Sequence, residues 1–135
     1  MSEPTLEQVE QLVAAARAAR EDAYAPYSRF PVGAAVLAGR RIFIGANVEN
    51  VSYPLGVCAE RNAVAAAVTA GERQVDAVAV VAGDRDVTPP CGGCRQVLNE
   101  FGPEMLVISE SPVGIRKTWR LSELLPDAFG PLSLP

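Results

Sequence analysis

The stretch that decides the fold is residues 58–83, CAERNAVAAAVTAGERQVDAVAVVAG. Its first part, from about Cys58 to Thr69, is apolar nearly all round, which predicts a helix that is buried on most sides. Its last part, residues 75–83, is rich in β-branched residues and predicts a central strand. A helix followed by a buried strand is the unit from which α/β domains are built.

The flanking sequence continues this alternation. Thr5, answered by Gln8 three residues later, predicts the capped start of a helix that runs to about Ala19. Further strands are expected at residues 32–39, 41–48, 105–109 and 114–121, with a tight turn near Gly39 and Arg40, a short helix at 91–102 and a closing helical turn at 122–130. The order of elements predicts an α/β domain.

The composition bounds the class of protein. The chain has 135 residues, of which 49% are hydrophobic, so we expect a single folded domain over residues 1–135. The net charge is −4 and the basic residues are scattered, which argues against nucleic acid as a partner. No run of about 20 apolar residues predicts a membrane span. The acidic N-terminus leads into no apolar signal core, so we expect a cytoplasmic protein.

Histidine is absent from the sequence, and this limits the chemistry that the chain can perform. Histidine is the usual general base near neutral pH and the commonest metal ligand. Any metal site or proton transfer must therefore use other residues. The cysteines number three, which is an odd count for disulfide pairing, and a cytoplasmic protein does not retain disulfides.

The cysteines have the spacing of metal ligands. Cys91 and Cys94 form a C-x-x-C pair at the start of the expected helix at residues 91–102, and Cys58 begins the expected helix that runs to Thr69. Three thiolates would leave one position of a tetrahedral zinc ion open, as in catalytic sites. Three other interpretations remain at this point: a redox dithiol, a structural zinc site, or a buried thiol that only packs in the core.

The charge of such a site requires compensation. Three thiolates and Zn²⁺ sum to −1, and a net negative site acidifies bound water poorly. The positive ends of two helices favour the thiolates. Arg61 is our candidate for a further compensating cation beside the metal, and Arg95 is the alternative. Either residue could equally be an ordinary surface arginine.

Glu60 is the candidate proton carrier, because the chain has no histidine and this carboxyl group lies two residues from Cys58. Burial in the site would raise its pKa toward the working range of a general base. A glutamate in the first turn of a helix also has a simpler explanation, since it complements the helix dipole.

Two segments together carry a resemblance to a known family. NVENVSYPLGVCAERNA (residues 47–63) and PPCGGCRQVL (residues 89–98) resemble the small homotetrameric cytidine deaminases. The resemblance extends from AYAPYSRFPVGAAV, residues 23–36, through SELLPDAFGP, residues 122–131. It implies a three-layer α/β/α sandwich with a mixed central sheet of about five strands.

The resemblance also implies the chemistry. One zinc ion per subunit is held by Cys58, Cys91 and Cys94, and water attacks C4 of the cytosine ring. Glu60 carries protons from the water to ring N3 and to the departing amine. The expected function is hydrolytic deamination of cytidine, and of 2′-deoxycytidine, to uridine or deoxyuridine and ammonia in pyrimidine salvage.

Substrate contacts follow from the same resemblance. Phe30 is expected to pack on the pyrimidine, Asn47 and Glu49 to hold the ribose hydroxyl, and the backbone of Ala59 to contact the base. Tyr53 and Phe129 are expected to reach the site of a neighbouring subunit. A homotetramer with sites at the subunit boundaries is therefore expected.

Two other functions compete with this one. The same zinc chemistry could act on a different aminated base or nucleoside analogue. A zinc-stabilised binding module without enzymatic activity is the second alternative. The acidic residue Glu49 argues against a phosphate at the ribose end, because it would repel the charge.

Overall fold

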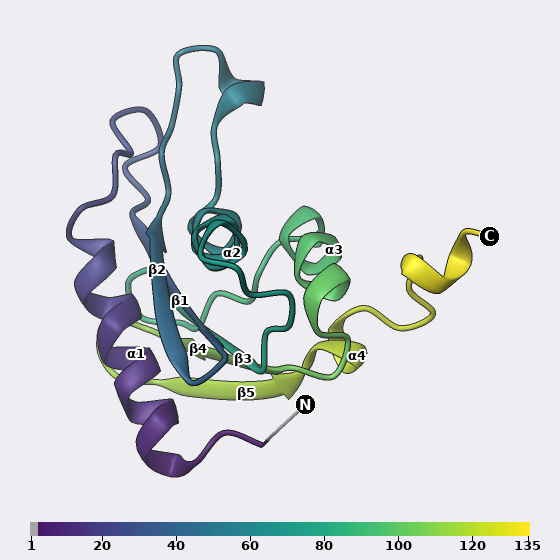
Figure 1. Ribbon diagram of the computed structural model, residues 1–135. Coiled ribbons are helices and arrows are strands. Elements are labelled where there is room, and N and C mark those ends of the chain that lie inside the picture. The colour runs from purple at the N-terminus through teal and green to yellow at the C-terminus, as the bar shows by residue number, and fades with distance from the viewer. Residues whose placement is uncertain (1–2) are drawn as a thin grey trace.

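Five strands form one mixed sheet in the computed structural model of the chain, which describes residues 3–135 (Figure 1). The order across the sheet is β2-β1-β3-β4-β5, in which β3 and β4 are parallel and the other neighbours are antiparallel. The strands are β1 (Val32–Ala38), β2 (Arg41–Ala46), β3 (Ala77–Ala82), β4 (Leu106–Glu110) and β5 (Arg116–Arg120). The expected number of strands and the central place of β3 are confirmed.

Helices cover both faces of this sheet, so the predicted three-layer α/β/α sandwich is also confirmed (Figure 1). The helices are α1 (Leu6–Arg20), α2 (Ala59–Thr69), α3 (Gly92–Phe101) and the single turn α4 (Leu121–Leu124), with 3-10 turns η1 (Tyr53–Leu55) and η2 (Pro131–Ser133). In the described part of the chain, no helix is long and apolar enough to cross a membrane.

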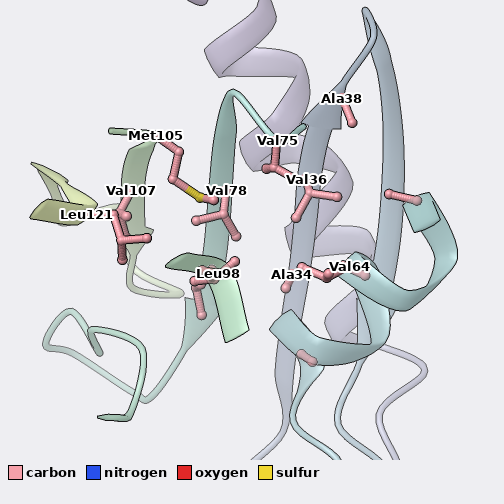
Figure 2. Packing of buried hydrophobic residues seen from close by; sticks show 14 of the residues in the cluster. Ala34, Val36, Ala38, Val64, Val75, Val78, Leu98, Met105, Val107 and Leu121 are labelled. Atoms are coloured by element: carbon pink, nitrogen blue, oxygen red, sulfur yellow. The ribbon is translucent and has the colours of Figure 1, made fainter. Parts of the chain in front are cut away.

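Two separate cores hold the layers together. On one face, Leu12 and Ala16 of α1 pack on Ala35 and Leu37 of β1 and on Ile108 of β4. On the other face, α2 and α3 cover a second core. Figure 2 shows that core, in which side chains from three strands and two helices meet: Ala34, Val36, Val78, Val107, Val64 and Leu98. Burying a valine or leucine side chain contributes about 1.5–3 kcal/mol, so the two cores supply most of the stability.

Local signals in the sequence explain where the elements begin and turn. The Thr5 side chain accepts a hydrogen bond from the Gln8 backbone, and the Gln8 side chain accepts one from the Thr5 backbone, so the predicted capping box starts α1. Gly39 and Arg40 have φ angles of 56° and 68°, as the tight β1–β2 turn requires. Cys58 and Cys91 are the N-cap residues of α2 and α3.

The strand register brings several chain ends to one edge of the sheet. Val32, at the start of β1, pairs with Ala82 at the end of β3. The next residue, Gly33, pairs with Ala46 at the end of β2. The loops that lead into α2 and α3 therefore leave the sheet from the same edge, beside the segment that enters β1.

The sheet buries one face of α2. Ala59, Ala63, Val64 and Ala67 are buried against the sheet, but Ala65, Ala66 and Thr69 are exposed. Within one chain, the predicted burial is therefore found on the face of α2 that meets the sheet, and burial of its other sides stays a prediction. Among residues 3–135, nothing covers the opposite face, which carries Ala65 and Ala66.

Gly45 of β2 allows α2 to lie close to the sheet. A Cβ atom at this position would lie 2.5 Å from the Ala59 carbonyl oxygen and 2.5 Å from the Ala63 nitrogen. Both atoms belong to the backbone of α2, so the contact cannot be relieved by rotating a side chain. The first turn of α2, which carries Glu60, can therefore lie this close to β2 only because residue 45 is a glycine.

Gly45→Ala is expected to lower the free energy of unfolding by about 1–3 kcal/mol, because the helix must move away from β2. Urea denaturation of the two proteins measures this change. Gly56→Ala is the matched control: Gly56 has φ −63° and an added Cβ would meet its nearest atom at 3.4 Å. Equal stability of the two variants would contradict the close-approach argument.

Candidate active site

The three cysteines converge at the edge of the sheet where α2 and α3 begin. Their sulfur atoms all lie within 4.8 Å of one another. In a tetrahedral site with Zn–S bonds of about 2.3 Å, neighbouring sulfurs are about 3.8 Å apart, so small side-chain adjustments suffice. An all-thiolate donor set suits zinc. The residues present therefore fit a zinc ion with three protein ligands.

The local fold favours the thiolate at Cys58, whereas the hydrogen bond with Cys58 and burial raise the pKa of Cys94. Cys58 and Cys91 occupy N-cap positions, and Cys94 lies in the first turn of α3. Unpaired backbone N–H groups at a helix start carry partial positive charge and stabilise a nearby anion. Hydrogen bonding with Cys94 and the adjacent Arg61 guanidinium lower the pKa of Cys58 to about 5. Metal ligation requires the thiolate form, so this environment prepares the site for a cation.

Arg61, rather than Arg95, is the cation beside the sulfur atoms. Its Nη2 lies 3.8 Å from Cys58 Sγ and also donates to the Gly56 carbonyl oxygen. Arg95 instead donates to the carbonyl oxygens of Pro90 and Leu124, at 2.7 Å and 2.9 Å. The structure thus separates the candidate Arg61 from the alternative, Arg95. Arg61 is placed to offset thiolate charge. Arg95 instead links α3 to the loop before it and to the end of α4.

Glu60 is buried next to the sulfur cluster, with 5% of its surface exposed. Burial raises the pKa of its carboxyl group, and the negative charge of Cys58 raises it further. A carboxyl group with a raised pKa retains its proton to higher pH than an ordinary surface glutamate does. The position in the first turn of α2 is therefore more than a complement to the helix dipole.

A cavity of about 440 Å³ opens beside the cysteines and Glu60. Its volume is in the range of small-molecule binding sites. The residues that the sequence predicted and that line this cavity are Phe30, Asn47, Glu49, Cys58, Ala59, Glu60 and Cys91. They come from the segment before β1, the segment after β2, and the starts of α2 and α3. The register of the sheet brings these four places together.

Glu49 is held by the turn that precedes Phe30. Its carboxylate accepts hydrogen bonds from the backbone N–H groups of Tyr27 and Ser28, at 3.0 Å and 3.1 Å, and from the Ser28 hydroxyl. The Ser28 hydroxyl bond is the main reason that the pKa of Glu49 is lowered. Glu49 is therefore a fixed anion at the rim of the cavity.

Asn47 and Ser28 connect the polar part of the cavity wall with the segment that carries the aromatic residue Phe30. The Asn47 side chain accepts from the Val32 N–H at 2.8 Å and donates to the Phe30 carbonyl oxygen at 3.0 Å. The Ser28 Oγ accepts from the Phe30 N–H at 3.0 Å while it donates to Glu49. These bonds orient the segment that carries Phe30.

Sequence reasoning did not single out several residues of the cavity wall: Ser28, Val32, Val80, Thr88 and Pro89. Ser28 lies between Tyr27 and Phe30, in a stretch where only the aromatic Phe30 was a predicted site residue. Val80 is an ordinary core valine by its pattern, since β3 is buried throughout. Only the fold shows that its side chain reaches the cavity.

Tyr53 and Phe129 do not line this cavity. Tyr53 is 74% exposed, its ring lies 5.9 Å from the Tyr27 ring, and it borders an adjoining hollow of about 280 Å³. Phe129 is 61% exposed, and its carbonyl oxygen accepts hydrogen bonds from Gln96 and Asn99. Within one chain, both rings are therefore apart from the cysteines.

Comparisons with known proteins bear on the site described above. The sequence matches the family model for the "Cytidine and deoxycytidylate deaminase zinc-binding region" over residues 6–110, which include all three cysteines and Glu60. It is 50% identical over 114 residues to the cytidine deaminase of Mycobacterium tuberculosis, with 84% of this chain and 83% of that protein covered. It is 46% identical over 124 residues to the cytidine deaminase of Sporosarcina psychrophila, with 90% of each protein covered.

Solved structures give the same result for the fold. The crystal structure of cytidine deaminase from Burkholderia pseudomallei has a TM-score of 0.85 and 47% identity, and the alignment covers 89% of this chain and 98% of that one. The structure of the M. tuberculosis enzyme has a TM-score of 0.79 and 48% identity, with 90% and 97% covered. The arrangement of the five strands and their helices is thus similar to that of solved cytidine deaminases.

Arg61→Ala is expected to speed the release of zinc to a chelator by at least about tenfold, because a charged hydrogen bond of about 1.5–3 kcal/mol is lost at Cys58. The rate is measured with a chelator that changes colour on binding zinc. Arg61→Lys retains the positive charge and is expected to have a smaller effect. Equal release rates for wild type and Arg61→Ala would exclude charge compensation by Arg61.

Proposed function

The chain belongs to the cytidine and deoxycytidylate deaminase family, and from this premise we propose that it catalyses the zinc-dependent hydrolytic deamination of cytidine to uridine and ammonia. The observation that carries the proposal is the meeting of three cysteine sulfurs, within 4.8 Å of one another, with a buried glutamate at the wall of a cavity of about 440 Å³. A zinc site with one open position and a proton carrier are the two requirements of this reaction.

Cys58, Cys91 and Cys94 would hold one zinc ion per subunit. When bound there, zinc supplies Lewis-acid chemistry that lowers the pKa of water. Arg61 offsets part of the charge of the three thiolates, because its guanidinium lies beside Cys58. The thiolates themselves are stabilised by the starts of two helices.

Glu60 is the catalytic residue in this proposal. Its raised pKa allows the carboxylate to accept a proton from the attacking water and to return it to ring N3 of the cytosine. A bond forms between the water oxygen and C4, and the bond between C4 and the exocyclic nitrogen breaks. Glu60 then takes the remaining proton of the added oxygen and delivers it to the amine, so that the C4 carbonyl forms and the amine departs as neutral ammonia.

The rest of the cavity wall would position the nucleoside. The Phe30 ring would pack on the face of the pyrimidine, and the Ala59 backbone would make a polar contact with the base. Glu49 and Asn47 would hold the ribose hydroxyl. Glu49 is suited to this role because three donors already fix its carboxylate, so that little side-chain freedom is lost on binding.

The charge of Glu49 bears on the choice of substrate. A carboxylate at the ribose end repels a phosphate group, which favours cytidine and 2′-deoxycytidine over their phosphates. Free nucleosides arise from nucleic-acid turnover, and their deamination is a step of pyrimidine salvage. We therefore place the enzyme in salvage, as a single domain over residues 1–135 that acts in the cytoplasm.

We further propose a homotetramer with active sites at the subunit boundaries. The exposed face of α2, with Ala65 and Ala66, would be covered by neighbouring subunits. Tyr53 and Phe129 are exposed aromatic side chains of the kind that would reach an adjacent site. Sedimentation velocity is expected to give a mass four times the 14.3 kDa of one chain, and a monomer at micromolar concentration would contradict the assembly.

The test of the function combines a metal analysis with an activity assay. The purified protein is expected to contain one zinc ion per chain and to convert cytidine to uridine with release of ammonia, and chelation is expected to abolish the activity reversibly. Cytosine and cytidine monophosphate are assayed in parallel. Preference for another aminated base would favour the same chemistry on a different substrate. Bound zinc without ammonia release from any of them would favour a binding module.

Glu60→Gln is expected to retain zinc and to lower kcat by at least about 100-fold, because the amide cannot carry a proton. Cytidine turnover and zinc content are measured on the same preparation. Glu100→Gln is the matched control, since Glu100 lies exposed on α3 away from the cavity. Turnover near that of wild type in Glu60→Gln would remove Glu60 from the mechanism.

A further inference from the structure

Ser109 is a fully buried serine on β4, and its hydroxyl group forms hydrogen bonds with one residue of another segment, Thr88. Its Oγ donates to the Thr88 carbonyl oxygen at 2.7 Å and accepts from the Thr88 N–H at 3.1 Å. One side chain thus satisfies both backbone groups of Thr88. Burying a hydroxyl group is unfavourable unless it is hydrogen-bonded, so these two bonds determine where the loop can lie.

The loop that Ser109 holds leads directly to the metal ligands. It comprises residues 84–90, and Cys91 follows it as the N-cap of α3. Among the backbone-to-backbone hydrogen bonds found across residues 3–135, none involves this loop. Side chains hold it instead: Ser109 binds Thr88, and Arg95 donates to the Pro90 carbonyl oxygen at 2.7 Å.

The place of Ser109 in the sheet connects this loop with the cavity. Ser109 pairs with Val80 in the parallel register of β3 and β4. Val80, Thr88 and Pro89 all line the cavity. The hydroxyl group therefore lies just behind the cavity wall and fastens to the sheet the segment from which Cys91 and Cys94 emerge.

We propose that Ser109 is a positioning residue for the metal site, which holds the Thr88–Cys91 segment so that the two thiolates of α3 meet Cys58. This inference rests on the proposed zinc-dependent function, because it assigns a role toward the same ligand set. Cys91 is exposed and Cys58 is only partly buried, so packing alone does not hold these sulfurs in place. Residues that orient metal ligands typically contribute 10–100-fold to metal affinity.

The test compares Ser109 with Ser111, a second buried serine that directly follows the end of β4. Ser111 is also fully buried, but its Oγ accepts from the Ile115 N–H at 3.0 Å in the β4–β5 turn. Zinc-loaded Ser109→Ala is expected to release zinc to a colour-forming chelator at least about tenfold faster than wild type. Ser111→Ala is expected to release zinc at the wild-type rate, although both variants lose a buried hydrogen bond and melt at lower temperature.

Three outcomes decide the proposal. Faster zinc release in Ser109→Ala than in Ser111→Ala supports a positioning role, and slower release in Ser109→Thr than in Ser109→Ala adds rescue by the retained hydroxyl. Equal release from Ser109→Ala and Ser111→Ala overturns the role while leaving the deaminase function intact. Wild-type protein that holds no zinc refutes the function itself, and the positioning role with it.

A second measurement needs no variant and therefore does not depend on whether Ser109→Ala folds. In the wild-type protein, the Thr88 N–H is expected to exchange with solvent deuterium more slowly than the N–H groups of residues 85–87, because it is bonded to a buried oxygen. Exchange of Thr88 at the rate of residues 85–87 would overturn the proposal.

Discussion

The structure depends on the strand register at one edge of the sheet. Because β1 is antiparallel to both β2 and β3, its first residue lies beside the last residues of those two strands. The segments that leave β2 and β3 go on to start α2 and α3, so two helix N-termini meet at this edge (Figure 1). Cysteines at both helix starts can then share one metal ion. Neither helix alone could supply three ligands.

Charge governs the chemistry that this edge can perform. The chain has no histidine, so its candidate metal ligands are thiols that bind as anions, and its candidate proton carrier is a carboxyl group. Such a cluster would repel itself without compensation. Two helix starts and the Arg61 guanidinium provide positive potential, while burial keeps Glu60 protonatable. Glu49, which three donors fix as an anion, lies at the other end of the cavity. The two carboxyl groups have different environments and therefore different tasks.

Polar side chains, together with backbone hydrogen bonds, hold the loops around the cavity. Asn47 joins the segment before β1 to the end of β2, Ser28 joins Glu49 to Phe30, and Ser109 joins β4 to Thr88. The wall of the cavity is thus built from loops that the sheet supports from behind. Loops can present functional groups only when a rigid scaffold fixes them, and these three residues make that connection.

Much of the fold and of the candidate site could be predicted from the sequence, because those features arise from residues that are close in the chain. The Thr5–Gln8 capping box, the Gly39–Arg40 turn and the β-branched run of β3 are local signals, and their elements lie where they were expected. The absence of histidine and the spacing of Cys58, Cys91 and Cys94 indicated a thiolate metal site as one of several interpretations, and the family resemblance selected it.

The tertiary structure decided what depends on contacts between distant residues. Arg61 and Arg95 have similar local sequence contexts, and only the fold places one of them against a sulfur atom. The alanine-rich composition of α2 predicted burial on most sides, but a single sheet face can cover only one side of a helix. Ser28 and Ser109 resemble ordinary serines in the sequence, because hydrogen bonds to residues 21 positions away leave no local pattern. The sequence by itself determined the element types and the ligand chemistry, whereas only the register of the sheet decided which side chains meet.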